Sequence, residues 1–422
     1  MGQLIQPVWL EPNEVPPLPR GWQAMPTEDA CIQLKPGKLF DSKSVAEEGA
    51  IPVLNQSEEG FLGFHNEEPG VVASPNTPVV TFANHTCAMR LMKRPFSTIQ
   101  NIFPKVGKPD VTDTTYFYYA ALGRVGLSEY KGHHPVFRRA HIPIPPLPIQ
   151  KKIVGVISAY DDLIENSQHR IRILETMARA LYREWFVDFR LPGHESVPRV
   201  ASPLPEGWHA VPFENLLVSM TGGDWGSEHP DGDETVEVMI VRGTDFEEIA
   251  FGGEIRAPIR YIKPSSFISR GLRLGDVIVE NSINAKSRCV GTPLLVDRSM
   301  LDRLAHDAVA ASFCKVFRFQ DASIAPLAYL HLRYLREGKR MEYYQNVAAN
   351  GIGNFQAKKF AAEECLVMPI DSDVRDELIG KITSLVEGIS LLASQIQSLR
   401  RTRDLLLPRL LSGQIDISPE AA

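Results

Sequence analysis

Two long stretches of the sequence place apolar residues at alternating three- and four-residue steps. This spacing predicts helices with an apolar stripe that repeats every 3.5 residues, which is the period of a coiled-coil seam. Each stretch covers roughly 40 residues, so each helix would be roughly 60 Å long at about 1.5 Å per residue. The stripe residues that we expect between the helices are Ile157, Ile164, Ile171, Leu174 and Leu181 in the first, and Leu378, Ile382, Leu385, Ile389, Leu392, Ile396, Leu399, Leu406 and Leu410 in the second.

The order of motifs around these helices repeats. Leu18 to Trp22 reads Leu-Pro-Arg-Gly-Trp, and Leu204 to Trp208 reads Leu-Pro-Glu-Gly-Trp. A Pro-Ile pair precedes each stripe, at Pro148-Ile149 and at Pro369-Ile370. A motif, a long mixed segment and a long helix therefore occur twice in the same order. This predicts an internal duplication in which Pro148 and Pro369 are equivalent.

The mixed segments combine strand and helix patterns. Thr77–Phe82 and Gly275–Glu280 each read as a turn followed by a strand rich in β-branched residues. Ala325–Tyr344 reads as a helix that covers a sheet. We predict a mixed α/β (α+β) fold with two globular domains and two long antiparallel coiled-coil helices, related by a pseudo-two-fold internal repeat. The expected parts are a first domain (1–147), a first helix (148–190), a linker (191–204), a second domain (205–368), a second helix (369–412) and a tail (413–422).

Length and composition are those of an ordinary protein of two or three domains. The chain has 422 residues, of which 44% are hydrophobic and 23% are charged. It has no run of eighteen apolar residues and no export signal, so we expect a cytoplasmic protein that does not contact a membrane. Five cysteines without a Cys-x-x-Cys pair argue against a zinc site. With a net charge of −6, any DNA contact must come from local clusters.

Polar clusters beside predicted strands and glycines are candidate DNA contacts. Base reading requires Arg, Lys, Asn or Gln, and phosphate contact requires Lys, Arg or backbone amides. The alternative for any single residue is a solvated surface charge. The candidates are Asn84, Arg90, Lys93, Arg94, Gln100, Asn101, Lys105, Lys108 and Arg138 in the first domain, and Asn281, Asn284, Lys286, Arg288, Asn350, Asn354, Gln356, Lys358 and Lys359 in the second.

One pair of candidates is expected at nearly equivalent places in the two domains. Gly132 and Gly353 lie equally far before their respective Pro-Ile pairs. The basic pairs that follow them are Arg138-Arg139 and Lys358-Lys359. If the Pro-Ile pairs are equivalent, these basic residues should occupy corresponding positions in the duplicated fold.

Several of these segments resemble the specificity subunits of type I restriction-modification systems. The stretch Ile142–Ile153 resembles the start of the family's first long helix, although Ile149 stands where the family has Glu. Asp161–Glu165 and Leu181–Phe186 continue the resemblance along that helix. Arg403–Ile415 resembles the family's C-terminal tail. The second helix start departs from the family, because Pro369 is followed by Ile-Asp-Ser and lacks the Glu-Gln pair.

The resemblance implies a subunit that is itself not an enzyme and reads a bipartite double-stranded DNA target, one half with each domain. It implies two methylation subunits and restriction or translocase subunits as partners. S-adenosylmethionine, ATP and Mg²⁺ would be bound by those partners, and this chain would bind no cofactor or metal. The assembled complex would be a site-specific deoxyribonuclease and adenine methyltransferase. The chain also has no Gly-x-x-x-x-Gly-Lys-Ser/Thr phosphate loop.

Two other functions are compatible with parts of the sequence. Pro109-Asp110 followed by Glu129-Tyr130-Lys131 loosely resembles the PD-(D/E)xK pattern of nucleases. In such sites, carboxylates and a lysine hold a metal ion and a water molecule. A stand-alone nuclease of this kind would cut DNA with Mg²⁺ alone. The long helices by themselves are also compatible with a coiled-coil adaptor that binds only proteins, but the duplicated globular domains favour DNA recognition.

Overall fold

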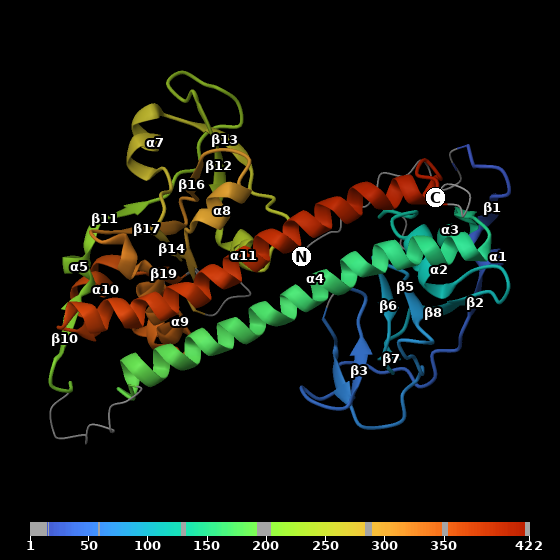
Figure 1. Cartoon of the computed structure of the whole chain (residues 1–422), viewed down its shortest axis with the longest axis horizontal. Helices are drawn as coiled ribbons and strands as arrows, with labels where there is room; N and C mark the ends of the chain where they lie inside the picture. Colours follow the sequence, from blue (N-terminus) through green and yellow to red (C-terminus); the bar gives the residue numbers. More distant parts are fainter. Residues whose placement is uncertain are drawn as a thin grey trace. The chain divides into compact units, whose positions relative to one another are not determined.

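The chain forms two compact units (Figure 1). The computed structural model describes residue Val15 and residues 17–57, 60–127, 132–191, 204–282, 289–347 and 353–417. Unit 1 comprises Met1–Asp162 and Leu399–Ala422, and unit 2 comprises Leu163–Ser398. None of the helices in the described ranges contains an apolar stretch of the length that a membrane span requires. Each unit therefore holds one globular domain together with parts of both long helices, whereas the sequence had suggested separate helical segments.

Unit 1 is built around a four-stranded antiparallel sheet with the order β2-β8-β5-β6. All five residues of the central strand β5 are buried. Val80 and Phe82 face one hydrophobic core, and Val79 faces a second core on the other side, as alternation along a strand requires. The strands are β2 (Cys31–Gln33), β5 (Val79–Ala83), β6 (Met89–Met92) and β8 (Ile102–Gly107).

A smaller sheet and three short helices complete this domain. The small sheet has the order β4-β3-β7, with β3 antiparallel to β4 and parallel to β7. Strand β1 (Gln23–Pro26) pairs separately with β9 (His141–Ile144). The remaining elements are β3 (Ile51–Leu54), β4 (Gly63–His65), β7 (Ser97–Thr98), α1 (Thr27–Ala30), α2 (Thr114–Ala121) and α3 (His134–Arg139).

Unit 2 repeats this topology. Its larger sheet has the order β11-β17-β14-β15 and its smaller sheet the order β13-β12-β16, with the same parallel and antiparallel pairings as in unit 1. Strands β10 and β20 pair as β1 and β9 do. The strands are β10 (Trp208–Pro212), β11 (Leu217–Gly222), β12 (Val236–Val241), β13 (Ile259–Ile262), β14 (Val277–Glu280), β15 (Pro293–Leu295), β16 (Ala308–Ala310), β17 (Cys314–Phe319) and β20 (Cys365–Pro369). The predicted internal duplication is therefore confirmed.

The helices of unit 2 include counterparts of those in unit 1 and several additions. A β-hairpin, β18 (Gln345–Val347) with β19 (Gly353–Phe355), stands between α9 and α10. The predicted helix 325–344 ends earlier, because Gly338 follows α9 and Lys339 adopts a left-handed conformation. The helices are α5 (Phe213–Leu216), α6 (Phe246–Ala250), α7 (Pro264–Arg270), α8 (Arg298–Arg303), α9 (Ala325–Glu337) and α10 (Ala357–Glu363), with 3₁₀ turns at Gly243–Asp245, Ala322–Ile324 and Arg340–Tyr344.

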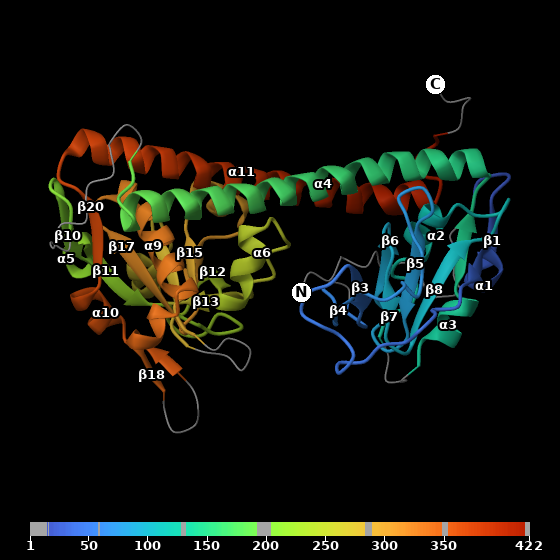
Figure 2. The same cartoon turned by 90° about the horizontal axis from the view of Figure 1, so that it is seen from below.

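The two long helices are α4 (Leu147–Tyr182), which continues through a π-helical turn at Arg183–Val187, and α11 (Ser372–Leu411). In each unit, the first part of one helix lies beside the last part of the other (Figures 1 and 2). In unit 1, Ile153 of α4 shares a core with Leu410 of α11. In unit 2, Tyr182 shares a core with Ile382. The helices therefore run antiparallel, as predicted.

The predicted stripe residues lie on the inner faces of these helices. Ile157, Ile171, Ile382 and Ile396 are fully buried. All the stripe residues named from the sequence are buried or half-buried. Arg403 interrupts the apolar stripe of α11. Its Nη1 donates a hydrogen bond to Oδ1 of Asp161 on α4 at 2.7 Å. The same carboxylate accepts a hydrogen bond from the Tyr119 hydroxyl, so this polar position is paired within unit 1.

Strand pairing corrects the alignment of the two repeats. Pro26 faces His141 in the β1–β9 pair, and Pro212 faces Cys365 in the β10–β20 pair. His141 is thus equivalent to Cys365. Pro145 lies as far after His141 as Pro369 lies after Cys365, so Pro145, and not Pro148, corresponds to Pro369. The predicted alignment was wrong because several prolines precede the first helix, and only the strand register distinguishes between them.

Candidate nucleic-acid interface

Two candidates in the first domain serve to fix loops. Asn84 follows β5, and its side-chain oxygen accepts the backbone N–H of His134 at 2.8 Å, at the start of α3. Arg90 of β6 donates from Nε to the Ser57 carbonyl at 2.9 Å and from Nη1 to the Gly60 carbonyl at 2.7 Å. A guanidinium used in this way anchors the loop between β3 and β4. In these contacts the Asn84 oxygen and the Arg90 guanidinium hold neighbouring loops in place.

The structure contradicts the prediction that Lys105 contacts DNA. Only 2% of its surface is exposed, because β8 is a central strand covered on both faces. Its Nζ donates to Gln33 Oε1 at 3.2 Å and lies 5.7 Å from the centre of the Phe137 ring. Burial lowers the pKa of this amine. We therefore exclude Lys105 from the interface, since a phosphate cannot reach a buried ammonium group.

The exposed candidates of the first domain are divided between the ends of its sheet. Lys93 and Arg94 follow β6 near the Val79 end of β5, and Lys93 Nζ lies 3.7 Å from Asp162. Arg94 lies 5.1 Å from the Phe61 ring. Gln100 and Asn101 lie in the exposed turn between β7 and β8, at the other end, where the Asn101 carbonyl accepts the Asn84 N–H.

A third exposed group lies beside α1. The backbone N–H of Lys108 donates to the Ala30 carbonyl, and Arg138 at the end of α3 forms an ion pair with Glu28 at 2.6 Å. Exposed ion pairs of this kind contribute about 0–1 kcal/mol, so a phosphate group could replace the carboxylate. The structure therefore does not gather the candidates of the first domain into one cluster.

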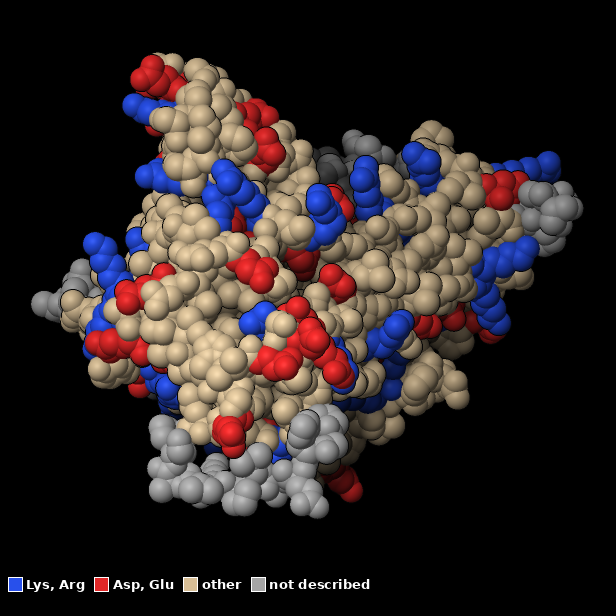
Figure 3. All heavy atoms as spheres, turned by 60° about the vertical axis from the view of Figure 1, so that its left-hand side comes forward, with Lys and Arg blue, Asp and Glu red and all other residues tan. Residues whose placement is uncertain are grey.

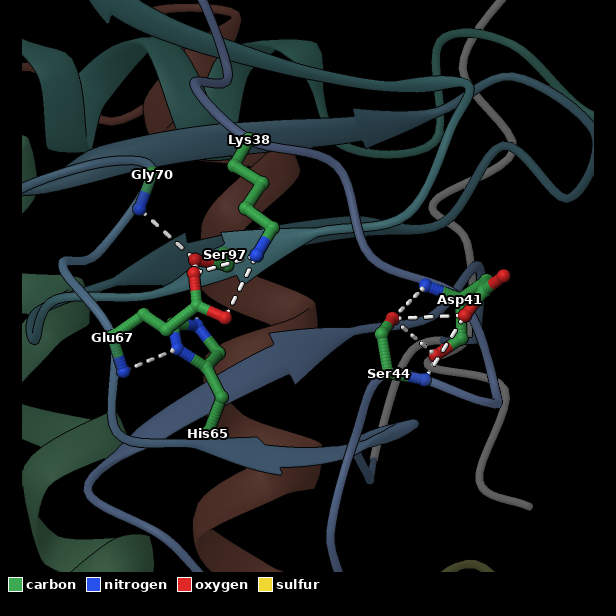
Figure 4. A network of polar contacts seen from close by, with 7 residues as sticks. All are labelled: Lys38, Asp41, Ser44, His65, Glu67, Gly70 and Ser97. Carbon is green, nitrogen blue, oxygen red and sulfur yellow. Dashed lines mark hydrogen bonds and ion pairs between the residues drawn. The ribbon is translucent and has the colours of Figure 1, made fainter.

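The small sheet of the first domain carries a polar network (Figure 4). His65 Nδ1 accepts the Glu67 backbone N–H at 3.1 Å, so Nε2 carries the proton and donates to Ser97 Oγ at 2.9 Å. Ser97 Oγ also accepts the Gly70 N–H, and Lys38 pairs with Glu67 at 2.6 Å. A histidine in this tautomer cannot take a proton from the serine. The network holds β4 and β7 together and lacks the general base of a hydrolase.

Among the residues that the structure describes, no group of three or more His, Cys, Asp or Glu side chains could hold a metal ion. Asp110 of the nuclease-like pattern is exposed and has a positive φ of 63°. Its expected partners Glu129 and Lys131 lie outside the described residues, as does Tyr130. All five cysteines are free thiols.

The second domain brings its described candidates together. The Asn281 carbonyl accepts the Phe355 N–H at 2.8 Å, and Asn354 precedes Phe355 on β19, where it bridges Ser282, the residue after Asn281. Gln356 occupies the N-cap position of α10 without a capping hydrogen bond from its side chain, and Lys358 and Lys359 follow in the first turn. Lys359 Nζ lies 3.7 Å from the Tyr343 ring centre. Asn284, Lys286, Arg288 and Asn350 lie outside the described residues. Sequence reasoning pointed to this stretch through Asn350, Asn354, Gln356, Lys358 and Lys359, but it did not single out Tyr343 or Asn346 as contacts.

The corrected repeat alignment separates the two basic pairs that were expected at equivalent places. Arg138 and Arg139 form the last turn of α3, whereas Lys358 and Lys359 lie in the first turn of α10. They are therefore about one helical turn apart in the duplicated fold. On the face shown in Figure 3, Lys and Arg side chains are interspersed with Asp and Glu. No extended basic field covers that face, so contacts with a polyanion would be local.

A buried polar network, which the sequence did not reveal, joins the second domain to α4. His331 Nε2 donates to Glu364 Oε1 at 3.1 Å, and Tyr182 Oη of α4 is hydrogen-bonded to His331 Nδ1 at 2.6 Å. The Tyr344 hydroxyl donates to Glu364 Oε2 at 2.9 Å. Burial raises the pKa of Glu364, but these hydrogen bonds and the attraction of His331 and Arg340 outweigh it, so the pKa lies below its ordinary value.

Replacing Glu364 with Gln should lower the free energy of unfolding at pH 7 by about 1–3 kcal/mol. The folded-state pKa of Glu364 is depressed, so its ionised form stabilises the fold above the unfolded-state pKa, and this contribution is lost as pH falls through the folded-state value. The difference between wild type and Glu364→Gln should therefore shrink below about pH 4.5. Denaturant titrations at several pH values, with the exposed neighbour Glu363→Gln as control, measure it. A difference independent of pH would contradict this account.

Comparison with known proteins places these features in context. Residues 19–176 match the family described as the type I restriction modification DNA specificity domain. The matched segment runs from the first Leu-Pro-x-Gly-Trp motif into α4 and contains the first globular domain. The chain is 24% identical over 361 residues to the type I restriction enzyme MjaIX specificity subunit of Methanocaldococcus jannaschii, covering 78% of this chain and 74% of that protein.

The fold is also similar to a solved structure. The S subunit of a type I restriction-modification system from M. genitalium superposes with a TM-score of 0.59. The superposition covers 97% of this chain and 100% of that chain at 14% sequence identity. At this level of identity the likeness concerns the fold alone.

Proposed function

Because this chain belongs to the family of type I restriction-modification specificity subunits, we propose that it reads a bipartite DNA target, one half with each globular domain. The observation that carries this proposal is the duplicated topology: the family match covers the first domain, and the second domain repeats its strand order and pairing. Two readers joined through the same pair of helices would bind DNA more tightly than either alone. The subunit itself belongs to a non-catalytic family.

The catalytic partners follow from the same proposal. We infer that two methylation subunits bind the long helices and that restriction or translocase subunits join through them. Apolar side chains on the outer faces support this, because Leu163 and Ile173 of α4 and Leu391 and Leu405 of α11 are exposed. S-adenosylmethionine, ATP and Mg²⁺ would be bound by the partners, whose complex cleaves DNA and methylates adenine. The complex would act in the cytoplasm, where the DNA lies.

A binding experiment tests the proposed function. The chain would be purified together with its methylation subunits and mixed with a library of random duplexes at several salt concentrations. Bound DNA should be enriched in two short sequences separated by a fixed gap, and the enrichment should survive at salt concentrations that remove non-specific binding. Equal retention of all duplexes would contradict DNA recognition and favour the adaptor. Cleavage by the purified chain with Mg²⁺ alone would favour the nuclease.

Inserting one heptad into each long helix should lengthen the gap between the half-sites. Suitable positions are between Asp162 and Leu163 and between Ser398 and Leu399, where the two units divide. Seven residues add about 10 Å of helix, or about three base pairs at about 3.4 Å each, and keep the apolar stripe in phase. Methylation mapping should show a longer gap between unchanged half-site sequences. An unchanged gap would show that the helices do not set the spacing.

A further inference from the structure

The two domains differ in the connection between their last two helices. In the first domain, segment 122–133 joins α2 to α3, and the part of it that the structure describes forms no strand. In the second domain, the longer segment 338–356 joins α9 to α10 and includes the β18–β19 hairpin. Figure 2 shows β18 on the side of unit 2 that faces away from α4 and α11. The hairpin is therefore one of the additions by which the second domain differs from the first.

One face of this hairpin carries a row of polar side chains. Asn346 and Asn354 are paired directly across the two strands, and both are exposed. Ser282 forms a bridge with Asn354 on the other side of β19. Partners across antiparallel strands point to the same face, so Asn346, Asn354 and Ser282 form a row. The Ser282 hydroxyl donates to Asn354 Oδ1 at 3.3 Å, which orients the amide of Asn354.

The opposite face of the hairpin base is fixed in the core. Phe355 is 5% exposed and lies 5.4 Å from the Phe360 ring centre. The backbone N–H of Gln356 donates to the Tyr344 carbonyl at 2.7 Å, and Gln345 Oε1 accepts the Val290 N–H. Side chains on a supported strand lose little freedom when they bind, so the row is already arranged for a ligand.

The dimensions and chemistry of the row fit the major groove of DNA. Three neighbouring strands span about 10 Å at about 4.8 Å per step, and the major groove is about 12 Å wide and admits a β-ribbon. An asparagine amide can donate to adenine N7 and accept from adenine N6, a contact that distinguishes A·T from the other base pairs. The Asn346 side chain is exposed on this face, so its amide oxygen and amide nitrogen can both reach a base edge.

We propose that Asn346 and Asn354, supported by Ser282, read adenine in the second half-site through the major groove, a contact for which the first domain has no counterpart among its described residues. This inference rests on the proposed function. The neighbouring cations supply the sequence-independent part of binding. Lys358 is exposed in the first turn of α10, and Lys359 lies against the Tyr343 ring, so both would reach phosphates rather than bases.

The test uses the chain assembled with its methylation subunits, after the target has been mapped. Each base pair of the second half-site is replaced in turn, and the dissociation constant of each duplex is measured. Wild type should discriminate by between about 5-fold and about 150-fold at an A·T pair contacted by an asparagine. Asn346→Ala or Asn354→Ala should abolish that discrimination at one position, leave the other positions unchanged and leave the first half-site unaffected.

Val347→Ala is the matched control, because Val347 is exposed on the same hairpin but belongs to the opposite face. It should preserve discrimination at every position. If both asparagine variants keep wild-type discrimination, or weaken all duplexes equally as loss of a phosphate contact would, the base-reading role is wrong. A change in the first half-site would also overturn it. A wild-type complex that binds all duplexes alike would instead overturn the proposed function itself.

Discussion

Replacing Leu392 with Asp should lower the free energy of unfolding by about 3–5 kcal/mol. Leu392 is 5% exposed in the middle of α11, between the fully buried Ala393 and Ile396 on one side and buried Ser390 on the other. The helix touches its own domain closely here: Ser299 Oγ donates to the Ser390 carbonyl at 2.7 Å. A carboxylate at this position would lose the apolar contacts of leucine and would bury a charge.

The neighbouring residue provides the control. Leu391 is 70% exposed, so Leu391→Asp introduces the same charge on the same helix without burying it. Its effect should stay within about 0.5 kcal/mol. Denaturant unfolding of the full chain, followed by circular dichroism, measures both variants. Equal stability of the two variants would show that the apolar stripe of α11 is not buried in solution, and the assignment of the helix faces would be wrong.

The sequence predicts the long helices and the duplication well, because both depend on local or repeated patterns. A stripe that recurs every 3.5 residues requires a buried helical face, and the structure buries it along both α4 and α11. The Leu-Pro-x-Gly-Trp motif marked two copies of one fold, and the strand orders agree. Arg403 stood within the stripe, and its pairing with Asp161 explains how the stripe tolerates a charge.

The sequence could not assign parts that depend on distant contacts. The last part of α11, from Leu399, belongs with the first domain, where Leu407 and Leu410 enter its core. The apolar stripe in the sequence predicts that a helix face is buried, but it does not predict which domain the end of the helix contacts. The alignment of the repeats was wrong for the same reason, because only the strand pairings β1–β9 and β10–β20 fix it.

Candidate contacts were the least predictable feature. Lys105 is buried and Arg90 is half-buried and bonded to loop carbonyls, whereas Lys108 and Arg94, which are the same residue types, are exposed. Composition cannot distinguish them, since burial is decided by the sheet order and by loops that fold back over strands. The hairpin row was missed for a related reason, because Ser282 is far from the hairpin in the sequence and joins the row only through β19.

Exchanging the first domain should change one half of the DNA target completely and leave the other half intact. The exchange would replace residues 27–140, between β1 and β9, with the corresponding segment of a relative. It keeps the β1–β9 pair, α4 and the second domain, so the connection to both long helices is preserved. Half-site reading depends on the side chains of each domain. The exchanged complex should therefore bind the original first half-site several kcal/mol more weakly, at about 1–3 kcal/mol for each mismatched base pair.

The reciprocal exchange is the matched control. Replacing residues 213–364, between β10 and β20, should alter only the other half-site. The gap between the half-sites should stay the same in both exchanges, since α4 and α11 are unchanged. A foreign domain that failed to fold would abolish methylation altogether, and this outcome is distinguishable from a changed target by the unfolding profile of the purified complex.

Methylation mapping tests the central claim most directly. DNA from cells that contain this chain and its methylation subunits would be sequenced for modified adenines, with the wild-type chain and with each single-domain exchange. We expect a bipartite methylated sequence with a fixed gap, in which each exchange alters one half only. Modified adenines without a bipartite pattern, or both halves changing after the exchange of one domain, would contradict two independent reading domains.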